Sequence, residues 1–207
     1  KHSGMLAYVS MKKRQGQNVP DLDYIDFNHP IQKEIVRTFA EMCGLSPEQV
    51  AKGVDGCSAP NFAIPLYNAA LGLARLADPE TGGVQPAERK EACRVITAAM
   101  MAHPDMVGGP GRFDTRLMQV TQGRIVSKGG AEAFQAMALM PGALKPGSPG
   151  IGIAMKIGDG DDRKQALHAT AMETLRQLGV LRPDELETLA GFGPTAKRFN
   201  WRKIEVG

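Results

Sequence analysis

Three strand-like segments follow one another in the second half of the chain, and this run constrains the fold most. They cover residues 123–127, 131–139 and 150–157, and turns rich in Gly and Pro join them. Strands joined by short turns pair antiparallel, because a parallel pair needs a long crossover connection. The sequence therefore predicts an antiparallel sheet rather than alternating β-α-β units.

Segments with helical periodicity precede and follow this run. Apolar residues recur with helical spacing in segments that we predict as helices, over residues 3–14, 31–42, 60–78, 86–101, 114–120, 161–178 and 185–190. Residues 51–57 indicate a short extended piece, and residues 202–206 a final strand. Helices grouped around consecutive strands are typical of an α+β fold, an antiparallel sheet flanked by helices. We expect a single α+β domain over residues 1–207.

Charge and composition exclude several classes of protein. The 25 basic and 22 acidic residues are scattered and only 5% of residues are aromatic, so the chain lacks the dense basic surface of a nucleic-acid-binding protein. No run approaches the roughly 18 apolar residues of a membrane span. Three cysteines without a C-x-x-C pair indicate a reducing compartment. Because no signal peptide is visible, we expect a cytoplasmic protein.

The segment Gly53-Val54-Asp55-Gly56-Cys57 places two reactive groups between glycines. In an extended segment Asp55 and Cys57 point the same way, and a predicted helix follows them. The positive end of that helix would favour the thiolate form of Cys57, which binds a metal or attacks an electrophile. The alternative is a tight turn with a small, buried cysteine.

Two further segments carry a lysine beside small residues. Lys1-His2-Ser3-Gly4 opens the chain, and this pair either orients a carboxylate, acts as a base or binds a metal, or is a frayed terminus. Lys128-Gly129-Gly130 lies at the edge of a predicted strand, where glycines let a substrate approach the backbone and Lys128 supplies positive charge. The alternative for this second segment is a turn with a solvated lysine.

Searches for nucleophile motifs mainly exclude enzyme classes. The chain has no G-x-S-x-G, P-loop or H-E-x-x-H motif, and chance explains the spacing Ser10-x-x-Lys13. Cys43 and Cys93 lie among apolar residues of predicted helices, which indicates inert core thiols. The histidines outside the opening segment are interpreted as structural, namely His29, His103 and His168.

Four motifs in a fixed order carry a family resemblance. They are Lys1-His2-Ser3-Gly4-Met5-Leu6, Gly53-Val54-Asp55-Gly56-Cys57 with Ala59-Pro60-Asn61, Lys128-Gly129-Gly130-Ala131-Glu132, and Lys156-Ile157-Gly158-Asp159-Gly160. Over essentially the whole chain they resemble the rhizobial-type L-asparaginases, the class 3 or asparaginase II family. Each motif by itself is a weak signal, whereas four in order are specific.

The resemblance implies a fold and an activity. The family's fold is similar to that of serine β-lactamases and glutaminases, and its reaction hydrolyses L-asparagine to L-aspartate and ammonia through a serine acyl-enzyme. The serine belongs to an S-x-x-K motif that we expect upstream of residue 1. The chain is therefore expected to be the C-terminal part of a longer amidohydrolase, and we also expect a homodimer.

The resemblance also implies roles for residues at the front of the chain. Lys1 is implied as a catalytic residue, and Lys1 and Cys57 as ligands of a modulatory or structural Zn²⁺ ion. His2 and Asp55 are implied to contact the amino-acid end of asparagine.

Lys128 and Gly129 are the remaining expected substrate-binding residues. Some family members carry another cysteine soon after K-G-G-A-E-G, and residues 133–136 of this chain contain none. Two other functions remain open: a non-catalytic amino-acid-binding or interaction domain, and a related hydrolase of the glutaminase or β-lactamase type.

Overall fold

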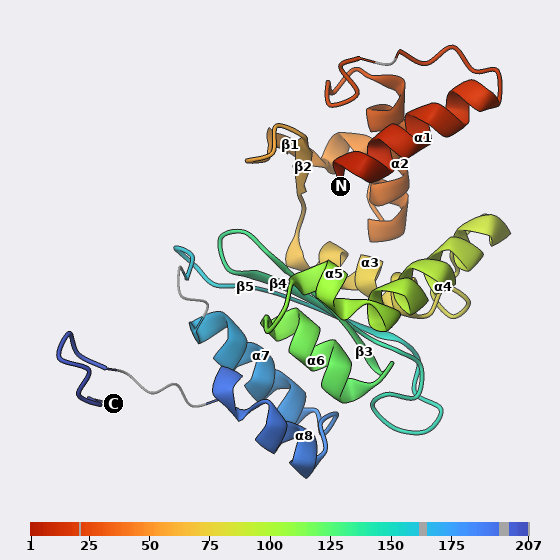
Figure 1. Cartoon of the computed structure of the whole chain (residues 1–207). Helices are drawn as coiled ribbons and strands as arrows, with labels where there is room; N and C mark the ends of the chain where they lie inside the picture. Colours follow the sequence, from red (N-terminus) through yellow and green to blue (C-terminus); the bar gives the residue numbers. More distant parts are fainter. Residues whose placement is uncertain (21, 162–164, 195–198, 207) are drawn as a thin grey trace. The chain divides into compact units, whose positions relative to one another are not determined.

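The computed structural model describes residues 1–20, 22–161, 165–194 and 199–206. Two compact units divide the chain, Lys1–Asn68 and Ala69–Gly207, and the boundary falls inside helix α3, Leu66–Ala77 (Figure 1). The single domain over residues 1–207 stays a prediction. Within the described residues, no helix is both long and apolar enough to cross a membrane.

Two helices and a small hairpin form the first unit. Its elements are α1 His2–Arg14, α2 Pro30–Cys43, the 3-10 turn η1 Pro47–Gln49, β1 Ala51–Val54 and β2 Pro60–Ala63. Met5 and Val9 of α1, Ile31 of α2 and Ala59 are buried in one apolar cluster. Because Ala59 directly precedes β2, this cluster also holds the hairpin against the two helices.

Helix α2 begins and ends where its local sequence predicts. His29 Nδ1 accepts a hydrogen bond from Ile31 N at 3.3 Å, and Pro30 occupies the first turn, where an amide donor has no partner in the helix. Gly44 ends the helix at a φ of 69°, a left-handed conformation that glycine adopts without steric cost. The helix predicted over residues 31–42 is confirmed, and the buried His29 is structural, as expected.

The helix predicted over residues 60–78 is wrong at its N-terminal end. Residues 60–63 form β2, which pairs antiparallel with β1, and α3 begins only at Leu66. Pro65 accounts for the late start, because proline disfavours the helical conformation of the residue before it. The extended piece expected at residues 51–57 is confirmed for residues 51–54.

Three antiparallel strands form the sheet of the second unit, in the order β3-β4-β5. They span Ile125–Gly130, Phe134–Leu139 and Ile151–Lys156, so the predicted run of three strands is confirmed. Strand β4 is central, and β3 and β5 are the edge strands.

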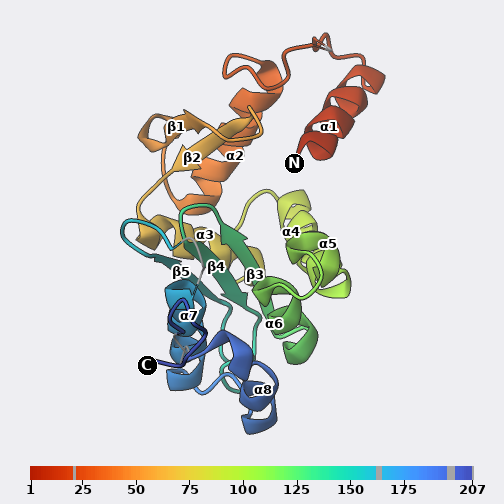
Figure 2. The same ribbon diagram turned by 60° about the vertical axis from the view of Figure 1, so that its left-hand side comes forward.

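Helices cover both faces of this sheet (Figure 2). In addition to α3, the helical elements of the second unit are α4 Ala87–Ala102, α5 Pro104–Gly108, α6 Phe113–Thr121, α7 Gln165–Gln177, α8 Pro183–Thr188 and η2 Ala190–Phe192. Leu117 of α6 and Met172 of α7 pack with Met137 on one face, whereas Leu73 of α3 packs with Val126 on the other. The α+β fold with a sheet flanked by helices is confirmed.

Gly152 shows how closely α3 approaches the sheet. A Cβ atom at Gly152 would lie 1.8 Å from the carbonyl oxygen of Ala70 in α3. Atoms cannot approach so closely, so this strand position requires a residue without a side chain.

Two predictions concern the C-terminal part of the chain. The helix predicted over residues 161–178 is confirmed as α7 from Gln165 on, and residues 162–164 lie outside the described residues. The final strand over residues 202–206 is wrong, because within residues 199–206 the backbone forms a turn with one bridge between Phe199 and Glu205. Asn200 Oδ1 accepts from the amides of Arg202 and Ile204 at 2.9 and 3.0 Å, which satisfies them within the turn.

Candidate functional site

The side chains of Lys1 and Asp55 meet in the first unit. Lys1 Nζ donates to Asp55 Oδ2 at 2.7 Å, and both side chains are half-exposed. Burial lowers the pKa of Lys1, but hydrogen bonds to Asp55 and Cys57 outweigh burial, so the pKa is raised. The bond from Lys1, followed by one from Gly56 N, holds the pKa of Asp55 below its ordinary value. The pair is therefore an ammonium beside a carboxylate.

A tight turn between β1 and β2 presents Asp55. The turn is closed by Asp55 N donating to Ala59 O at 2.9 Å and by Ser58 N donating to Asp55 O at 2.8 Å. Ser58 has a φ of 66°, as a reversal of this kind requires. Gly56 N donates to Asp55 Oδ1 at 2.8 Å, which leaves Oδ2 directed at Lys1.

Cys57 lies exposed in this turn, with its Sγ 3.8 Å from Asp55 Oδ2. The tight turn of the alternative interpretation is therefore confirmed, whereas its buried cysteine is wrong. The expected helix N-terminus after Cys57 is also wrong, because strand β2 follows the turn. The charged groups beside the thiol are instead the carboxylate of Asp55 and the ammonium of Lys1.

His2 is held by a residue that the sequence analysis missed. His2 Nδ1 lies 2.9 Å from the hydroxyl oxygen of Tyr24, and the two rings meet edge to face with centroids 5.8 Å apart. The carbonyl oxygen of Tyr24 accepts a hydrogen bond from Gln32 Nε2 at 2.6 Å, and Gln32 is buried in α2. The second residue of the chain is thus oriented by a chain of contacts, whereas a frayed terminus would lack one. No local pattern around Tyr24 marks it in the sequence.

Lys128 and Gly129 lie near the end of β3 in the second unit. Lys128 is exposed, and its Nζ donates to the carbonyl oxygen of Gly129. Gly129 N donates to Asp114 Oδ2 at 2.8 Å, so this amide is not available to a substrate oxygen. Ile157 N donates to Ala133 O at 3.1 Å, which brings the fourth motif beside the turn of the third. The substrate contacts of Lys128 and Gly129 stay a prediction.

Comparison with known families extends these observations to the whole chain. A family model described as L-asparaginase II matches residues 1–207. The chain belongs to the L-asparaginase II family. This match confirms the resemblance drawn from four motifs and supports amidohydrolase activity of the asparaginase kind in general. No curated protein matches the chain at a significant level.

Two residues of this L-asparaginase II family member offer atoms of the kind that zinc accepts. Lys1 offers a nitrogen and Cys57 a sulfur, both close to the Asp55 carboxylate, and zinc accepts nitrogen, sulfur and oxygen ligands. The described part of the chain contains no group of three His, Cys, Asp or Glu side chains that could hold a metal. Protein zinc sites generally use three or four protein ligands. The residues present therefore fit zinc in the kind of atom that they offer but do not by themselves make a complete ligand set, and Zn²⁺ stays a prediction.

The other cysteines and His168 have structural surroundings. Cys43 and Cys93 are buried, and burial raises the pKa of the Cys93 thiol, which keeps it protonated and inert. The ring of His168 stacks on Phe113 with centroids 4.6 Å apart and meets Phe192 edge to face. The interpretation of these residues as core elements is confirmed for both cysteines.

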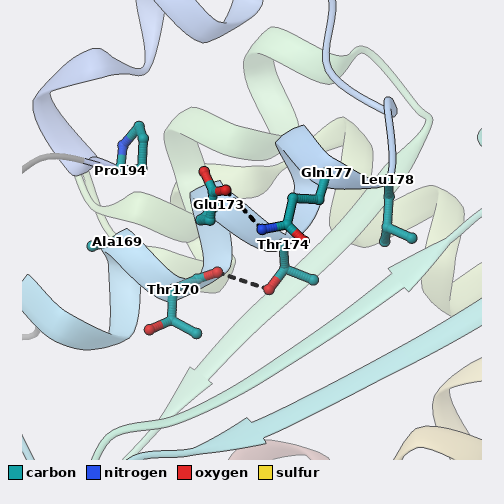
Figure 3. A pocket seen from close by; sticks show the side chains of 7 residues that line it. All are labelled: Ala169, Thr170, Glu173, Thr174, Gln177, Leu178 and Pro194. Carbon is teal, nitrogen blue, oxygen red and sulfur yellow. Dashed lines mark hydrogen bonds between the residues drawn. The ribbon is translucent and has the colours of Figure 1, made fainter.

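A groove runs along α7, and none of the predicted site residues lines it (Figure 3). It is lined by Ala169, Thr170, Glu173, Thr174, Gln177, Leu178 and Pro194. Its polar groups are engaged with one another: Thr174 Oγ1 donates to Thr170 O and Gln177 Nε2 donates to Glu173 Oε1, each at 2.8 Å. Arg176 beside the groove lowers the pKa of Glu173 to about 2, so this carboxylate is ionised and paired with the Arg176 guanidinium. The groove is not a candidate active site.

Proposed function

We propose that this chain is part of an L-asparagine amidohydrolase that forms L-aspartate and ammonia. The observation that carries the proposal is the Lys1–Asp55 ion pair beside the Cys57 thiol, at the positions that family motifs mark. The match over residues 1–207 supports the same class of reaction.

The proposed reaction needs a nucleophile that we place upstream of residue 1. A serine hydroxyl attacks the side-chain amide carbon of asparagine and passes its proton to a basic partner. The carbon–nitrogen bond breaks, the proton leaves with ammonia, and water then cleaves the acyl-serine ester to release aspartate. Backbone or side-chain donors must stabilise the oxyanion, and Gly129 N is excluded because it donates to Asp114.

The described residues would recognise the zwitterionic end of asparagine. The half-exposed Asp55 carboxylate suits the α-ammonium group, and His2, held by Tyr24, provides a second polar group of fixed orientation in the same unit. Lys1 supplies a positive charge for the α-carboxylate or, once deprotonated, a base. Lys128, in β3 of the second unit, is retained as a further proposed substrate-binding residue.

We also propose that the protein binds Zn²⁺, forms a homodimer and lies in the cytoplasm. Lys1 and Cys57 would hold the ion, which supplies a fixed positive charge at the substrate-binding groups when bound. For Lys1 to coordinate zinc its amine must be neutral, so zinc binding by Lys1 would release a proton.

The test is ammonia release from asparagine by the full-length protein, with glutamine and a β-lactam as competing substrates. We expect release from asparagine, and Lys1→Met to lower it strongly. Lys145→Met is the matched control, since Lys145 is an exposed lysine in the second unit. A folded full-length protein that binds aspartate without releasing ammonia would instead be an amino-acid-binding domain. Hydrolysis of glutamine or of a β-lactam in preference to asparagine would reassign the substrate.

A further inference from the structure

A buried carboxylate that the proposed reaction does not use lies beside Lys128. Asp114, the second residue of α6, is only 8% exposed. Its Oδ1 accepts hydrogen bonds from Ser127 Oγ at 2.6 Å and Gln135 Nε2 at 2.8 Å, and its Oδ2 accepts one from Gly129 N at 2.8 Å. These three donors are neutral groups. The carboxylate is therefore held by dipoles, to which the N-terminal turn of α6 adds.

Two of these bonds hold the strand on both sides of Lys128. Ser127 and Gly129 are its neighbours in β3, and both donate to Asp114. Helix α6 lies beside β3, an edge strand of the sheet (Figure 2), so the Gly129 amide can reach a partner outside the strand ladder. Side chains alternate along a strand, and Ser127 is accordingly buried while Lys128 is exposed on the opposite face. The carboxylate thus fixes the backbone from which Lys128 projects.

Gln135 connects this arrangement to the centre of the sheet. It is buried in β4 and lies opposite Gly129 in the strand register. Its Nε2 lies 2.8 Å from Asp114 Oδ1 and 2.9 Å from Ser127 Oγ. The network therefore joins α6, β3 and β4 at the end of the sheet that carries Lys128.

We propose that Asp114 is a positioning residue that holds Lys128 for substrate binding, an inference that rests on the proposed asparagine hydrolysis. A neutral side chain of similar size could fill the same space without the large desolvation cost of a buried charge. Packing alone therefore does not explain a carboxylate at this position. What the carboxylate adds is two strong acceptor atoms in a fixed geometry. A misplacement of about 1 Å in an active site can change a rate by about 100-fold, so this clamp has a measurable consequence.

The test measures kcat and KM for asparagine in the full-length protein with Asp114→Asn, Lys128→Met and both substitutions. Asn keeps the size of the side chain but replaces one acceptor oxygen by a donor, so at least one of the three bonds is lost. We expect Asp114→Asn to raise KM about tenfold while kcat changes less than about threefold. We expect the double variant to match Lys128→Met, because Asp114 acts through Lys128. Additive effects on KM would overturn the proposal.

Thr121→Val is the matched control for a loss of stability in the same helix. Thr121 is buried at the other end of α6, and its Oγ1 donates to Leu117 O at 2.8 Å. We expect this variant to lower Tm and to leave KM unchanged. An equal rise in KM in Thr121→Val and Asp114→Asn would show that KM follows stability, and the positioning role would then be wrong.

Two further measurements cover the remaining outcomes. If Asp114→Asn does not fold, Gln135→Met removes one of the three donors at similar volume. We expect this variant to raise KM about threefold in the wild-type background and to leave KM unchanged in the Lys128→Met background. A rise in KM that persists in the Lys128→Met background would overturn the proposal. If the wild-type protein releases no ammonia, the proposed function fails. Calorimetric binding of L-aspartate to the same variants then decides the positioning role, with the same non-additivity expected.

Discussion

Lys1 Nζ and Asp55 Oδ2 lie 2.7 Å apart, although 54 positions separate the two residues in the chain. Their meeting depends on apolar packing nearby. Met5, four residues after Lys1, and Ala59, four residues after Asp55, belong to one buried cluster. Burial of these apolar side chains therefore holds the start of α1 against the β1–β2 turn, and the ion pair forms on that support.

Asp55→Asn is expected to lower kcat/KM for asparagine about 100-fold, because it removes the charge that pairs with the α-ammonium group. The Lys1–Asp55 pair is half-exposed, so its loss is expected to leave the urea midpoint of unfolding nearly unchanged. Steady-state kinetics and urea titration measure the two effects. Asp105→Asn, an exposed aspartate in α5, serves as control. A large drop in stability together with unchanged kinetics would remove Asp55 from the substrate site.

Tyr24→Phe tests the orientation of His2. The substitution removes the hydroxyl that lies 2.9 Å from His2 Nδ1 and retains the edge-to-face ring contact. We expect kcat/KM to fall about fivefold and the unfolding free energy to fall by about 1 kcal/mol, as for one partly buried hydrogen bond. Tyr67→Phe, at a tyrosine that is 77% exposed, is the control. Equal kinetics in both variants would mean that Tyr24 does not orient His2 for the reaction.

Cys57→Ser is expected to weaken zinc binding about tenfold or more, because a hydroxyl replaces the sulfur ligand. Zinc content after equilibration with a metal-buffered solution measures the effect. Cys93→Ala, at a buried cysteine of the second unit, should keep the zinc content of the wild type. Unchanged zinc affinity in Cys57→Ser would remove Cys57 from the ligand set.

A buried carboxylate with two arginine partners in the second unit predicts how stability depends on pH. Glu185 is 2% exposed, and its carboxylate pairs with Arg124 and with Arg182, whose Nη2 lies 2.7 Å away. Burial raises the pKa of Glu185, but bonds from Arg124 and from Arg182 N outweigh burial and lower it. A lowered folded-state pKa adds stability above the unfolded-state value of about 4.3. That stability is lost as the pH falls through the folded-state pKa.

Glu185→Gln is therefore expected to reduce the unfolding free energy by about 2 kcal/mol at pH 7, since it removes the charge-assisted bonds that Arg124 and Arg182 make to a buried carboxylate. The difference from the wild type should begin to shrink as the pH falls below the unfolded-state pKa of about 4.3, and it should be smallest below the lowered folded-state pKa, where the wild-type carboxylate has gained its proton. Urea unfolding at several pH values measures both free energies. Glu88→Gln, at an exposed glutamate of α4, should show little difference at any pH. A constant difference between Glu185→Gln and the wild type down to strongly acid pH would contradict this account.

Much of the fold follows from local sequence. The three strands of the sheet and the helices α2, α4 and α7 could be predicted because period, caps and turn residues lie within a few positions of one another. Strand β2 could not, because its apolar residues match a helix equally well and its pairing with β1 is a tertiary choice. The strand expected at residues 202–206 failed for a related reason, since no neighbouring strand continues the pairing beyond one bridge within residues 199–206.

The candidate site was predictable in its chemistry and less so in its contacts. Lys1, His2, Asp55 and Cys57 stand in motifs that identify them. No local pattern marks Tyr24 or Asp114, because each contacts a residue distant in the chain: Tyr24 contacts His2 and Asp114 contacts Gly129.

The sequence by itself determined the class of fold, the order of most elements and the family to which the motifs point. These depend on residue spacing and on short segments, which a chain carries whether or not it is folded. The tertiary structure decided that Lys1 pairs with Asp55, that Tyr24 holds His2, and that Asp114 takes the amide of Gly129. Each of these contacts requires two atoms to approach within about 3 Å, and only the packing of whole elements brings residues so far apart in sequence to that distance.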